Sequence, residues 1–376
     1  MANRRPARIM YAATDNCADM LYATRMHVPD PFLWARIRGR TYAVLSDLEL
    51  DRGRREAHVD RVVPLSTLER KARPLPGRRP PIAELIARFL RDHKTGGAEV
   101  PHDFPVGVAD ELRRLGLLIR PARGHFFPTR ISKTNEEIVA IRAAQRSAEA
   151  AMARAEEILR ACRPDRRGRL SYAGRCLTSE FLQGEINSCL SRLGASAQHT
   201  IVAGGNQACD PHEAGHGPLP AHHPIIVDIF PRVARTGYWG DITRTFVRGN
   251  PSEAARELYA TVLEGQRKAL RQIRAGADGA RIQRDTRAFF DSKGYATGEK
   301  NGRRSGFFHG LGHGVGLEIH EAPRFADGPL PRNAVVSVEP GLYYPGIGGI
   351  RIEDLVVVTD RGYANLTTYP KRFVLG

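Results

Sequence analysis

The sequence predicts an α+β protein with a smaller N-terminal α/β domain and a larger C-terminal domain. Up to about residue 127, short apolar runs rich in β-forming residues occur beside amphipathic helical patterns. After residue 134, two helical patterns followed by strand-like runs occur twice, without obvious sequence identity between the two halves. This order indicates a duplicated half, so we place the two domains at residues 1–127 and 128–376.

The composition of the 376 residues, 41% hydrophobic and 26% charged, is that of an ordinary globular protein. No apolar run approaches the roughly 20 residues of a membrane span, and the N-terminal stretch MANRRPARIMYAATDN lacks the apolar core of a secretory signal. Five cysteines are scattered without a C-x-x-C pair, which argues against a disulfide framework or a structural zinc site. We therefore expect a cytoplasmic protein with no membrane partner.

The formal net charge of +16 allows two interpretations. A basic face binds nucleic acid in many proteins, whereas arginines distributed over a whole surface keep a protein solvated. Here the arginines are spread along the whole chain, and few aromatic residues lie among them. A nucleic-acid partner is therefore disfavoured, and it is kept as an alternative.

The N-terminal domain contains patterns for two kinds of element. Apolar runs predict strands at 18–24 (ADMLYAT), 40–47 (RTYAVLSD) and 117–120 (LLIR). Spacings of three and four between apolar residues predict an amphipathic helix at 82–94, ended by two glycines, and a shorter helix at 109–116. No cluster of chemically reactive residues occurs in this region, so we expect a packing or lid domain.

The C-terminal domain begins after a boundary segment at 128–134. Its first half predicts a long helix at 135–162, capped by Thr134 or Asn135, and a second helix that ends at Gly194. Its second half predicts helices at 252–274 and 280–293, the first capped by Asn250 or Ser252. Strands are predicted at 199–205, 223–230 and 241–247 in the first half, and at 317–321, 334–340 and 349–359 in the second.

One stretch, residues 308–324, reads FHGLGHGVGLEIHEAPR and combines His309, His313 and His320 with four glycines. Glycine allows a ligand to approach the backbone closely, and histidine is the commonest metal ligand. The stretch therefore indicates metal or proton chemistry, provided that other segments supply partners.

Acidic residues in apolar strands supply those partners. Asp228 ends PIIVD and Asp241 opens DITRT, while Glu339 follows AVVSV and Glu353 lies in GIRIEDLVVV. If the first pair lies on a hairpin, its two carboxylates approach one another. In the second pair, strand alternation places Arg351 beside Glu353, where it would orient that carboxylate and compensate its charge.

Four buried acids repel one another unless cations lie between them. An oxygen-rich shell with one imidazole favours Mn²⁺, with Zn²⁺, Co²⁺ or Fe²⁺ as alternatives, and two ions that share carboxylates activate water for hydrolysis. Each acid or histidine alone is more simply interpreted as a solvated strand end or a packed side chain. The joint pattern is much harder to explain by packing.

These residues resemble a known family. The runs HGLGHGVGLEIHEAP, VEPG and GIRIED are similar to signatures of the pita-bread metallopeptidases, which comprise methionine aminopeptidases, aminopeptidase P and prolidases. The resemblance covers roughly residues 130–370, and ADMLYAT looks like part of the N-terminal domain of the aminopeptidase P and prolidase branch. It implies a pita-bread (creatinase/aminopeptidase) fold that follows a smaller, creatinase-like N-terminal α/β domain in the sequence.

The resemblance also implies roles for individual residues. Two divalent metal ions would be held by five ligands, with the second aspartate and the last glutamate bridging them: Asp228, Asp241, His313, Glu339 and Glu353. Glu339 would also be the general base or proton shuttle. Four further residues match active-site groups of the family: His212, His309, His320 and, beside the metals, Arg351. Arg324 resembles a prolidase arginine that meets the substrate's C-terminal carboxylate.

One feature departs from the family pattern. The second aspartate usually follows the first by about eleven positions, whereas Asp241 follows Asp228 by thirteen. A hairpin tip absorbs two extra residues, so we expect the ligands to survive and the pocket rim to differ.

The resemblance therefore implies a metallopeptidase that cleaves Xaa-Pro bonds in dipeptides or short peptides through a metal-bridging hydroxide. Dipeptidase and aminopeptidase remain open at this point, because surrounding loops and the N-terminal domain determine how the pocket closes. A homodimer and a proline-containing peptide substrate are expected. Two alternatives are a non-catalytic scaffold of this fold that binds nucleic acid and a creatinase-like amidinohydrolase that needs no metal; the intact ligand set disfavours both.

Overall fold

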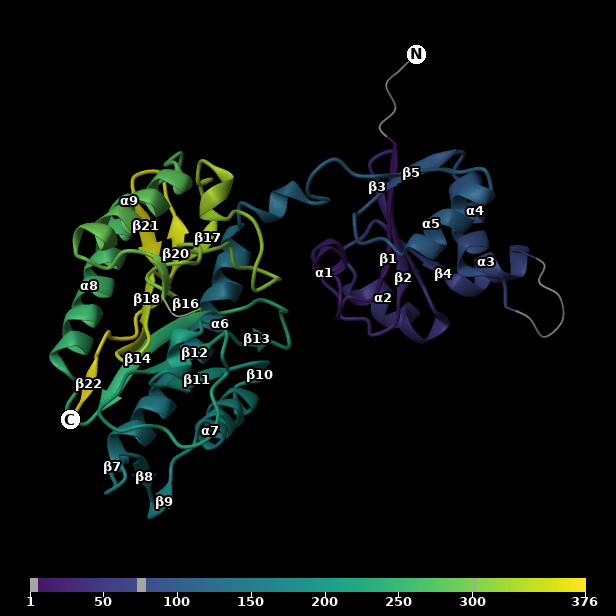
Figure 1. Ribbon diagram of the computed structural model, residues 1–376. Helices are drawn as coiled ribbons and strands as arrows, with labels where there is room; N and C mark the ends of the chain where they lie inside the picture. Colours follow the sequence, from purple (N-terminus) through teal and green to yellow (C-terminus); the bar gives the residue numbers. More distant parts are fainter. Residues whose placement is uncertain (1–5, 73–78, 301) are drawn as a thin grey trace. The chain divides into compact units, whose positions relative to one another are not determined.

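The computed structural model describes residues 6–72, 79–300 and 302–376 (Figure 1). The first five residues of the N-terminal stretch, which is not expected to be a secretory signal, lie outside the described residues. The chain separates into two compact units, Met1–Pro128 and Thr129–Gly376. In the described residues, every helix is too short or too polar to cross a bilayer.

The first unit is built on one six-stranded sheet in the order β4-β3-β2-β1-β5-β6. β1, β2 and β3 pair antiparallel, whereas β4, β5 and β6 add in parallel at the two edges. The strands are β1 (Ala7–Ala12), β2 (Phe32–Ile37), β3 (Arg40–Leu45), β4 (Arg61–Pro64), β5 (Gly97–Val100) and β6 (Leu118–Pro121). The helices are α1 (Ala18–Thr24), α2 (Leu50–Glu56), α3 (Leu65–Ala72), α4 (Ile82–Asp92) and α5 (Val106–Arg114).

Successive residues of the central strands enter two different cores. Ile9 and Leu33 pack with α4 and α5, while their neighbours Met10 and Trp34 pack with α1 on the opposite face. Because side chains alternate along a strand, a continuous apolar run is required where both faces of the sheet are covered.

The prediction of a strand at 18–24 is wrong, because these residues form α1. Met20, Leu21 and Thr24 are buried along one helical face, and the helix ends at Arg25 in the left-handed conformation. A run of seven residues with this spacing fits either element, and packing on the sheet decides for the helix. The predictions at 40–47, 82–94, 109–116 and 117–120 are confirmed within a few residues by β3, α4, α5 and β6.

The second unit repeats helix pairs and sheets in the predicted order. Its helices are α6 (Asn135–Ala161), α7 (Ser179–Arg192), α8 (Glu253–Leu270) and α9 (Gly279–Ser292). Thr134 caps α6 in a capping box with Glu137, and Ser252 caps α8. The first-half strands are β7 (Arg163–Pro164), β8 (Leu170–Tyr172), β9 (Arg175–Cys176), β10 (Ala195–Ser196), β11 (Ile201–Gly204), β12 (Ile225–Ile229), β13 (Arg232–Val233) and β14 (Ile242–Arg248). The others are β15 (Gly298–Lys300), β16 (Arg303–Ser305), β17 (Val335–Val338), β18 (Gly341–Tyr344), β19 (Gly348–Arg351), β20 (Asp354–Val358), β21 (Tyr363–Asn365) and β22 (Val374–Leu375).

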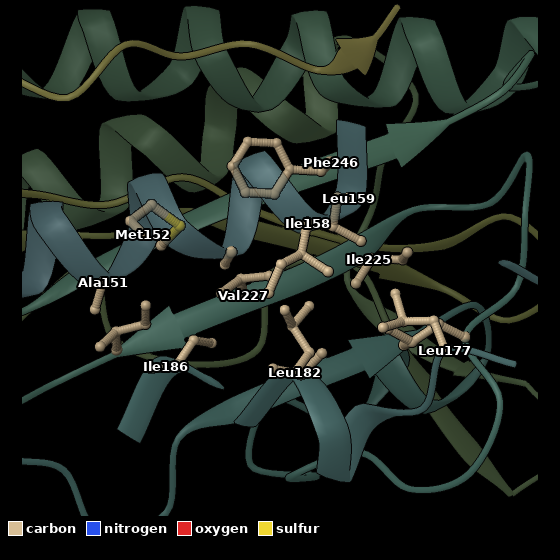
Figure 2. Close-up of a cluster of buried hydrophobic side chains, with 14 of the residues drawn as sticks. Ala151, Met152, Ile158, Leu159, Leu177, Leu182, Ile186, Ile225, Val227 and Phe246 are labelled. Atoms are coloured by element: carbon tan, nitrogen blue, oxygen red, sulfur yellow. The ribbon is translucent and has the colours of Figure 1, made fainter. Parts of the chain in front are cut away.

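Three small sheets form the centre of this unit, in the orders β11-β12-β14-β22, β17-β20-β21 and β18-β19. In the first half, side chains from α6 and α7 close over β12 and β14, as Met152, Leu182, Val227 and Phe246 show (Figure 2). A second cluster joins α8 and α9 to β17 and β20. Each helix pair thus covers one sheet.

The strand predicted at 317–321 is absent, since these residues form bends. Gly314 and Glu321 exchange backbone hydrogen bonds, and Gly316 N donates to Glu318 O, which folds the segment back on itself. The histidine-rich stretch is therefore a tight loop beside β17, where a single bridge joins Gly314 to Val336.

A buried ion cluster ties this loop to the segment that precedes α6. Glu321 accepts from Lys133 Nζ at 2.6 Å and from Arg130 Nη2 at 2.6 Å, and the side chain of Lys133 is only 1% exposed. Burial raises the pKa of Glu321, but the charges of Lys133 and Arg130 outweigh it and lower that pKa below 4.5. The loop is thus held by charge as well as by backbone.

We expect Glu321→Gln to lower the free energy of unfolding by about 3 kcal/mol at neutral pH, since it leaves a buried lysine without its counter-charge. Because the folded-state pKa of Glu321 lies below its unfolded value of 4.5, the stabilisation is complete above pH 4.5 and is lost as pH falls through the folded pKa. The difference in free energy of unfolding between the wild type and the variant should therefore shrink as pH falls. Urea unfolding of both proteins from about pH 7 to about pH 3 measures this difference. Glu318→Gln is the control, because the Glu318 side chain also binds Arg130 but is 54% exposed.

A close backbone contact sets the entry into β14. A Cβ on Gly240 would lie 2.6 Å from the carbonyl carbon of Ala144 in α6. We expect Gly240→Ala to destabilise the protein by about 1–3 kcal/mol, because helix and strand must separate. Gly184→Ala is the matched control in a helix with open space, and it is expected to stabilise by about 0.5–1 kcal/mol. Equal thermal shifts for the two variants would contradict the contact.

Candidate metal centre

A cavity of about 740 Å³ opens in the second unit, and the acidic residues singled out by the sequence line it. It is bounded by the ends of β12, β14 and β17, by the histidine-rich loop and by α9. Its lining includes Asp228, Asp241, His313, Glu339 and Glu353, together with His212, His309, His320, Arg324 and Arg351. The structure therefore brings all the predicted site residues to one cavity.

The first acid pair comes from two neighbouring antiparallel strands. Asp228 lies in β12 directly opposite Thr243 of β14, and Asp241 comes two residues before Thr243. Alternation puts both aspartates on the face that meets the cavity. The connection between them contains β13, which pairs with β10. It also contains Trp239, whose backbone and indole N–H groups donate to the carbonyls of Gly316 and Leu317.

The second acid pair comes from the other half of the chain. Glu339 follows β17, and Glu353 lies between β19 and β20. Glu353 contacts the strand that follows Asp241, because Thr243 Oγ1 donates to its Oε2 at 2.9 Å. The two halves also meet through the hydrogen bond from Glu353 N to Thr243 O and through those between Thr245 and Arg351.

His313 completes the cluster from the histidine-rich loop. Its Nε2 lies 3.2 Å from Glu339 Oε1 and 3.7 Å from Asp241 Oδ2. Side-chain ligand atoms of Asp241, His313 and Glu353 all lie within 4.8 Å of one another, a spacing that suits a metal ion. Ser337 braces the loop, since its Oγ accepts from His313 N and donates to Glu339 Oε1.

Arg351 has a different partner from the one that strand alternation predicts. Its Nη2 donates to Asp228 Oδ2 at 2.7 Å, and the hydroxyl of Thr243 takes the expected place beside Glu353. The expected direct contact is replaced because β19 ends at Arg351 and β20 begins at Asp354, so Arg351 and Glu353 do not share one regular strand. The expected charge compensation is present, since the charge of Arg351 works to lower the pKa of Glu353.

The electrostatics of this cluster call for added positive charge. Burial, and then the neighbouring carboxylates, raise the pKa values of Asp241 and Glu353 well above their usual range. Burial also raises the pKa of Asp228, and its buried Oδ1 has no hydrogen-bond partner among the residues that the structure describes. A carboxylate set that resists ionisation and includes such an oxygen fits divalent cations.

Glu339 differs from the other acids. Burial works to raise its pKa, but the hydrogen bond and charge of His313 prevail and lower that pKa to about 2. The same contact raises the pKa of His313 against the effect of burial. Glu339 is therefore ionised over the whole physiological range and able to accept a proton.

His309 is held by a chain of hydrogen bonds that the sequence does not reveal. Gly310 O can only accept, so His309 Nδ1 carries the proton that it donates there at 2.8 Å. His309 Nε2 then accepts from Tyr343 Oη at 2.9 Å, and Tyr343 Oη accepts in turn from Arg351 Nη1 at 3.1 Å. Tyr343 follows VEPG at a strand position where a tyrosine is commonly a packing residue, and no local signal marks it.

His320 and His212 are more open to the cavity. The ring of His320 stands edge-on to that of His313 with 4.3 Å between centroids. Burial, and then the nearby charge of His313, lower the pKa of His320 to about 4, so that its imidazole is neutral at physiological pH. Arg324 also lines the cavity.

Known proteins resemble this chain in sequence and in fold. Residues 139–360 match metallopeptidase family M24. An Xaa-Pro dipeptidase from Pyrococcus furiosus is 34% identical over 245 residues, which cover 63% of this chain and 63% of that protein. An Xaa-Pro dipeptidase from Pyrococcus horikoshii is 36% identical over 179 residues, or 46% of this chain and 48% of that protein. The chain thus spans about half to two thirds of the length of these relatives.

The solved structures extend the likeness of fold to nearly the whole chain. The structure of an Xaa-Pro dipeptidase from Bacillus anthracis matches 98% of this chain and 94% of its own, with a TM-score of 0.80 and 25% identity. The X-Pro aminopeptidase from Thermotoga maritima matches 98% and 97%, with a TM-score of 0.80 and 23% identity. The expected pita-bread fold is confirmed. With more than half of its residues in the family match, this protein belongs to metallopeptidase family M24.

Proposed function

We propose that the protein is a metal-dependent peptidase that hydrolyses Xaa-Pro bonds in dipeptides or short peptides. The observation that carries this proposal is that four carboxylates and His313 line one cavity, where burial and mutual repulsion raise the pKa values of Asp241 and Glu353. Two Xaa-Pro dipeptidases among the relatives, at 34% and 36% identity, support the substrate class.

The five ligands of the proposal are Asp228, Asp241, His313, Glu339 and Glu353. They would hold two divalent ions, with Asp241 and Glu353 shared between them, and Mn²⁺ is favoured by the oxygen-rich donor set over Zn²⁺, Co²⁺ or Fe²⁺. Bound ions would supply Lewis acidity and lower the pKa of a water molecule. The shared position of Asp241 and Glu353 is supported by their proximity and by their raised pKa values.

The remaining steps rely on the chain's own groups. Glu339 accepts the proton that the attacking water releases and passes it to the leaving proline nitrogen. His320, neutral at physiological pH, donates an N–H to the oxyanion that develops on the scissile carbonyl. His212 faces the same cavity and assists in binding the substrate.

His309 acts with help from its neighbours. Both of its ring nitrogens are engaged, by Gly310 O and by Tyr343 Oη. To contact substrate, the imidazole exchanges its bond to Tyr343 for one to the peptide, while Arg351 continues to hold the tyrosine hydroxyl. Arg351 thereby supports the substrate pocket through Tyr343 and the metal ligands through Asp228.

We further propose that the protein acts in the cytoplasm as a homodimer. The free state of all five cysteines supports a reducing compartment. The homodimer follows from the family resemblance, and light scattering of the purified protein measures it. Nucleic-acid binding and metal-free amidinohydrolysis are not favoured by any feature of the cavity.

Removal of metal is expected to abolish cleavage of Xaa-Pro dipeptides, and Mn²⁺ to restore it, as measured by proline release. Asp241→Asn should lower kcat by more than about 100-fold, because the loss of one bridging charge costs several kcal/mol of transition-state stabilisation. Glu264→Gln is the control, since this half-exposed acid in α8 lies outside the cavity and pairs with Lys268 and Lys293. Undiminished turnover in the presence of a strong chelator would refute the proposal.

Arg324 is expected to bind the C-terminal carboxylate of a dipeptide. Arg324→Met should raise KM for an Xaa-Pro dipeptide by about 10-fold or more, because a charge-assisted hydrogen bond is lost. The same dipeptide with an amidated C-terminus lacks the charge and should show little change. Arg332→Met, on the surface beside Asp360, serves as the control. If KM rises equally for both substrates, Arg324 does not bind the C-terminal carboxylate.

A further inference from the structure

Two buried glutamines hold the backbone of the segments that carry the acids. Gln145 lies in α6 and Gln266 in α8, and both have no exposed surface. Neither residue lines the cavity. They occupy helix faces that otherwise pack against strands through apolar side chains, so a leucine at either position would fill the space at less desolvation cost.

Gln145 hydrogen-bonds both backbone polar groups of one proposed metal ligand, Asp241. Its Oε1 accepts from Asp241 N at 2.8 Å, and its Nε2 donates to Asp241 O at 2.9 Å. The same Nε2 also donates to Thr367 Oγ1 at 3.0 Å, which fixes the plane of the amide. Two opposed hydrogen bonds to one residue leave its backbone little freedom to rotate.

Gln266 hydrogen-bonds the backbone next to the other two acids. Its Nε2 donates to Val338 O at 2.9 Å and to Ile352 O at 3.0 Å, the residues immediately before Glu339 and Glu353. One amide group therefore sets the spacing between the two segments that supply these glutamates. Within the described part of the chain its buried Oε1 has no partner, so the donor end of the side chain accounts for the presence of an amide here.

A carboxylate leaves its backbone along the Cα–Cβ bond, so fixing the backbone beside it fixes the direction in which the side chain starts. Gln145 does this for Asp241 in the first half, and Gln266 for Glu339 and Glu353 in the second. Groups that orient metal ligands without touching the metal commonly change metal affinity or activity by about 10–100-fold when they are replaced.

We propose that Gln145 and Gln266 are positioning residues that hold the three acids at the separations needed for a pair of divalent ions. The inference rests on the metal site of the proposed function. It assigns each half of the chain one buried amide that serves the ligands of that half.

Calorimetric titration of the chelator-treated protein with Mn²⁺ tests the proposal. Gln145→Met and Gln266→Met keep the approximate side-chain length and remove the amide. Each is expected to weaken Mn²⁺ binding by about 10-fold or more. In the Mn²⁺-saturated enzyme kcat should fall while KM for an Xaa-Pro dipeptide stays the same, because neither glutamine touches the substrate cavity. Gln145→Asn and Gln266→Asn retract the amide by one carbon and remain polar, and they replace any methionine variant that does not fold.

Matched controls separate positioning from general stability. Glu156→Gln in α6 removes the charge and one of the two acceptor oxygens that bind Tyr369, Arg160 and Arg372, and Thr261→Val in α8 loses a bond to its own helix. Both should lower the melting temperature and leave Mn²⁺ affinity unchanged. Folded glutamine variants that bind Mn²⁺ as tightly as the wild type would overturn the inference, whereas a wild-type protein that binds no ion would overturn the proposed function itself.

Discussion

Four carboxylates share one cavity in which burial opposes their ionisation, and much of the second unit serves to keep them there. Their repulsion is reduced by His313, which hydrogen-bonds Glu339, and by Arg351, which pairs with Asp228. Asp241 and Glu353 have no such cation within hydrogen-bonding distance among the described residues, and burial and the neighbouring carboxylates raise their pKa values. The apolar cores on both sides supply the free energy that holds these strands together against this repulsion.

The fold could be predicted from the sequence where periodicity is long and punctuated. The capping box at Thr134 and the glycines that follow α7 and α9 mark helices that the structure contains. Short segments failed for a physical reason. Residues 18–24 satisfy strand and helix patterns equally, and 317–321 has strand-like residues but is drawn into a loop by Gly314 and Gly316.

The site could be predicted in its ligands and less well in their supports. Acids that interrupt apolar runs are conspicuous, because a buried charge needs a reason. The supports are ordinary residues with no such signal: Thr243, Ser337 and Tyr343 look like strand residues, and their roles depend on which strand lies opposite. The pairing of Arg351 with Asp228 rather than Glu353 depends on a break between β19 and β20 that alternation cannot show.

The meeting of the two halves at the base of the cavity has a consequence for how the protein is made. Thr243 and Glu353, which share a hydrogen bond, are separated by 110 positions in the chain. Contacts of such long range form late, because the loop between them must close first. During synthesis, the two aspartates therefore leave the ribosome before the glutamates that complete the cavity. The set of five candidate ligands is complete only after the second half of the chain has been made and has closed onto the first.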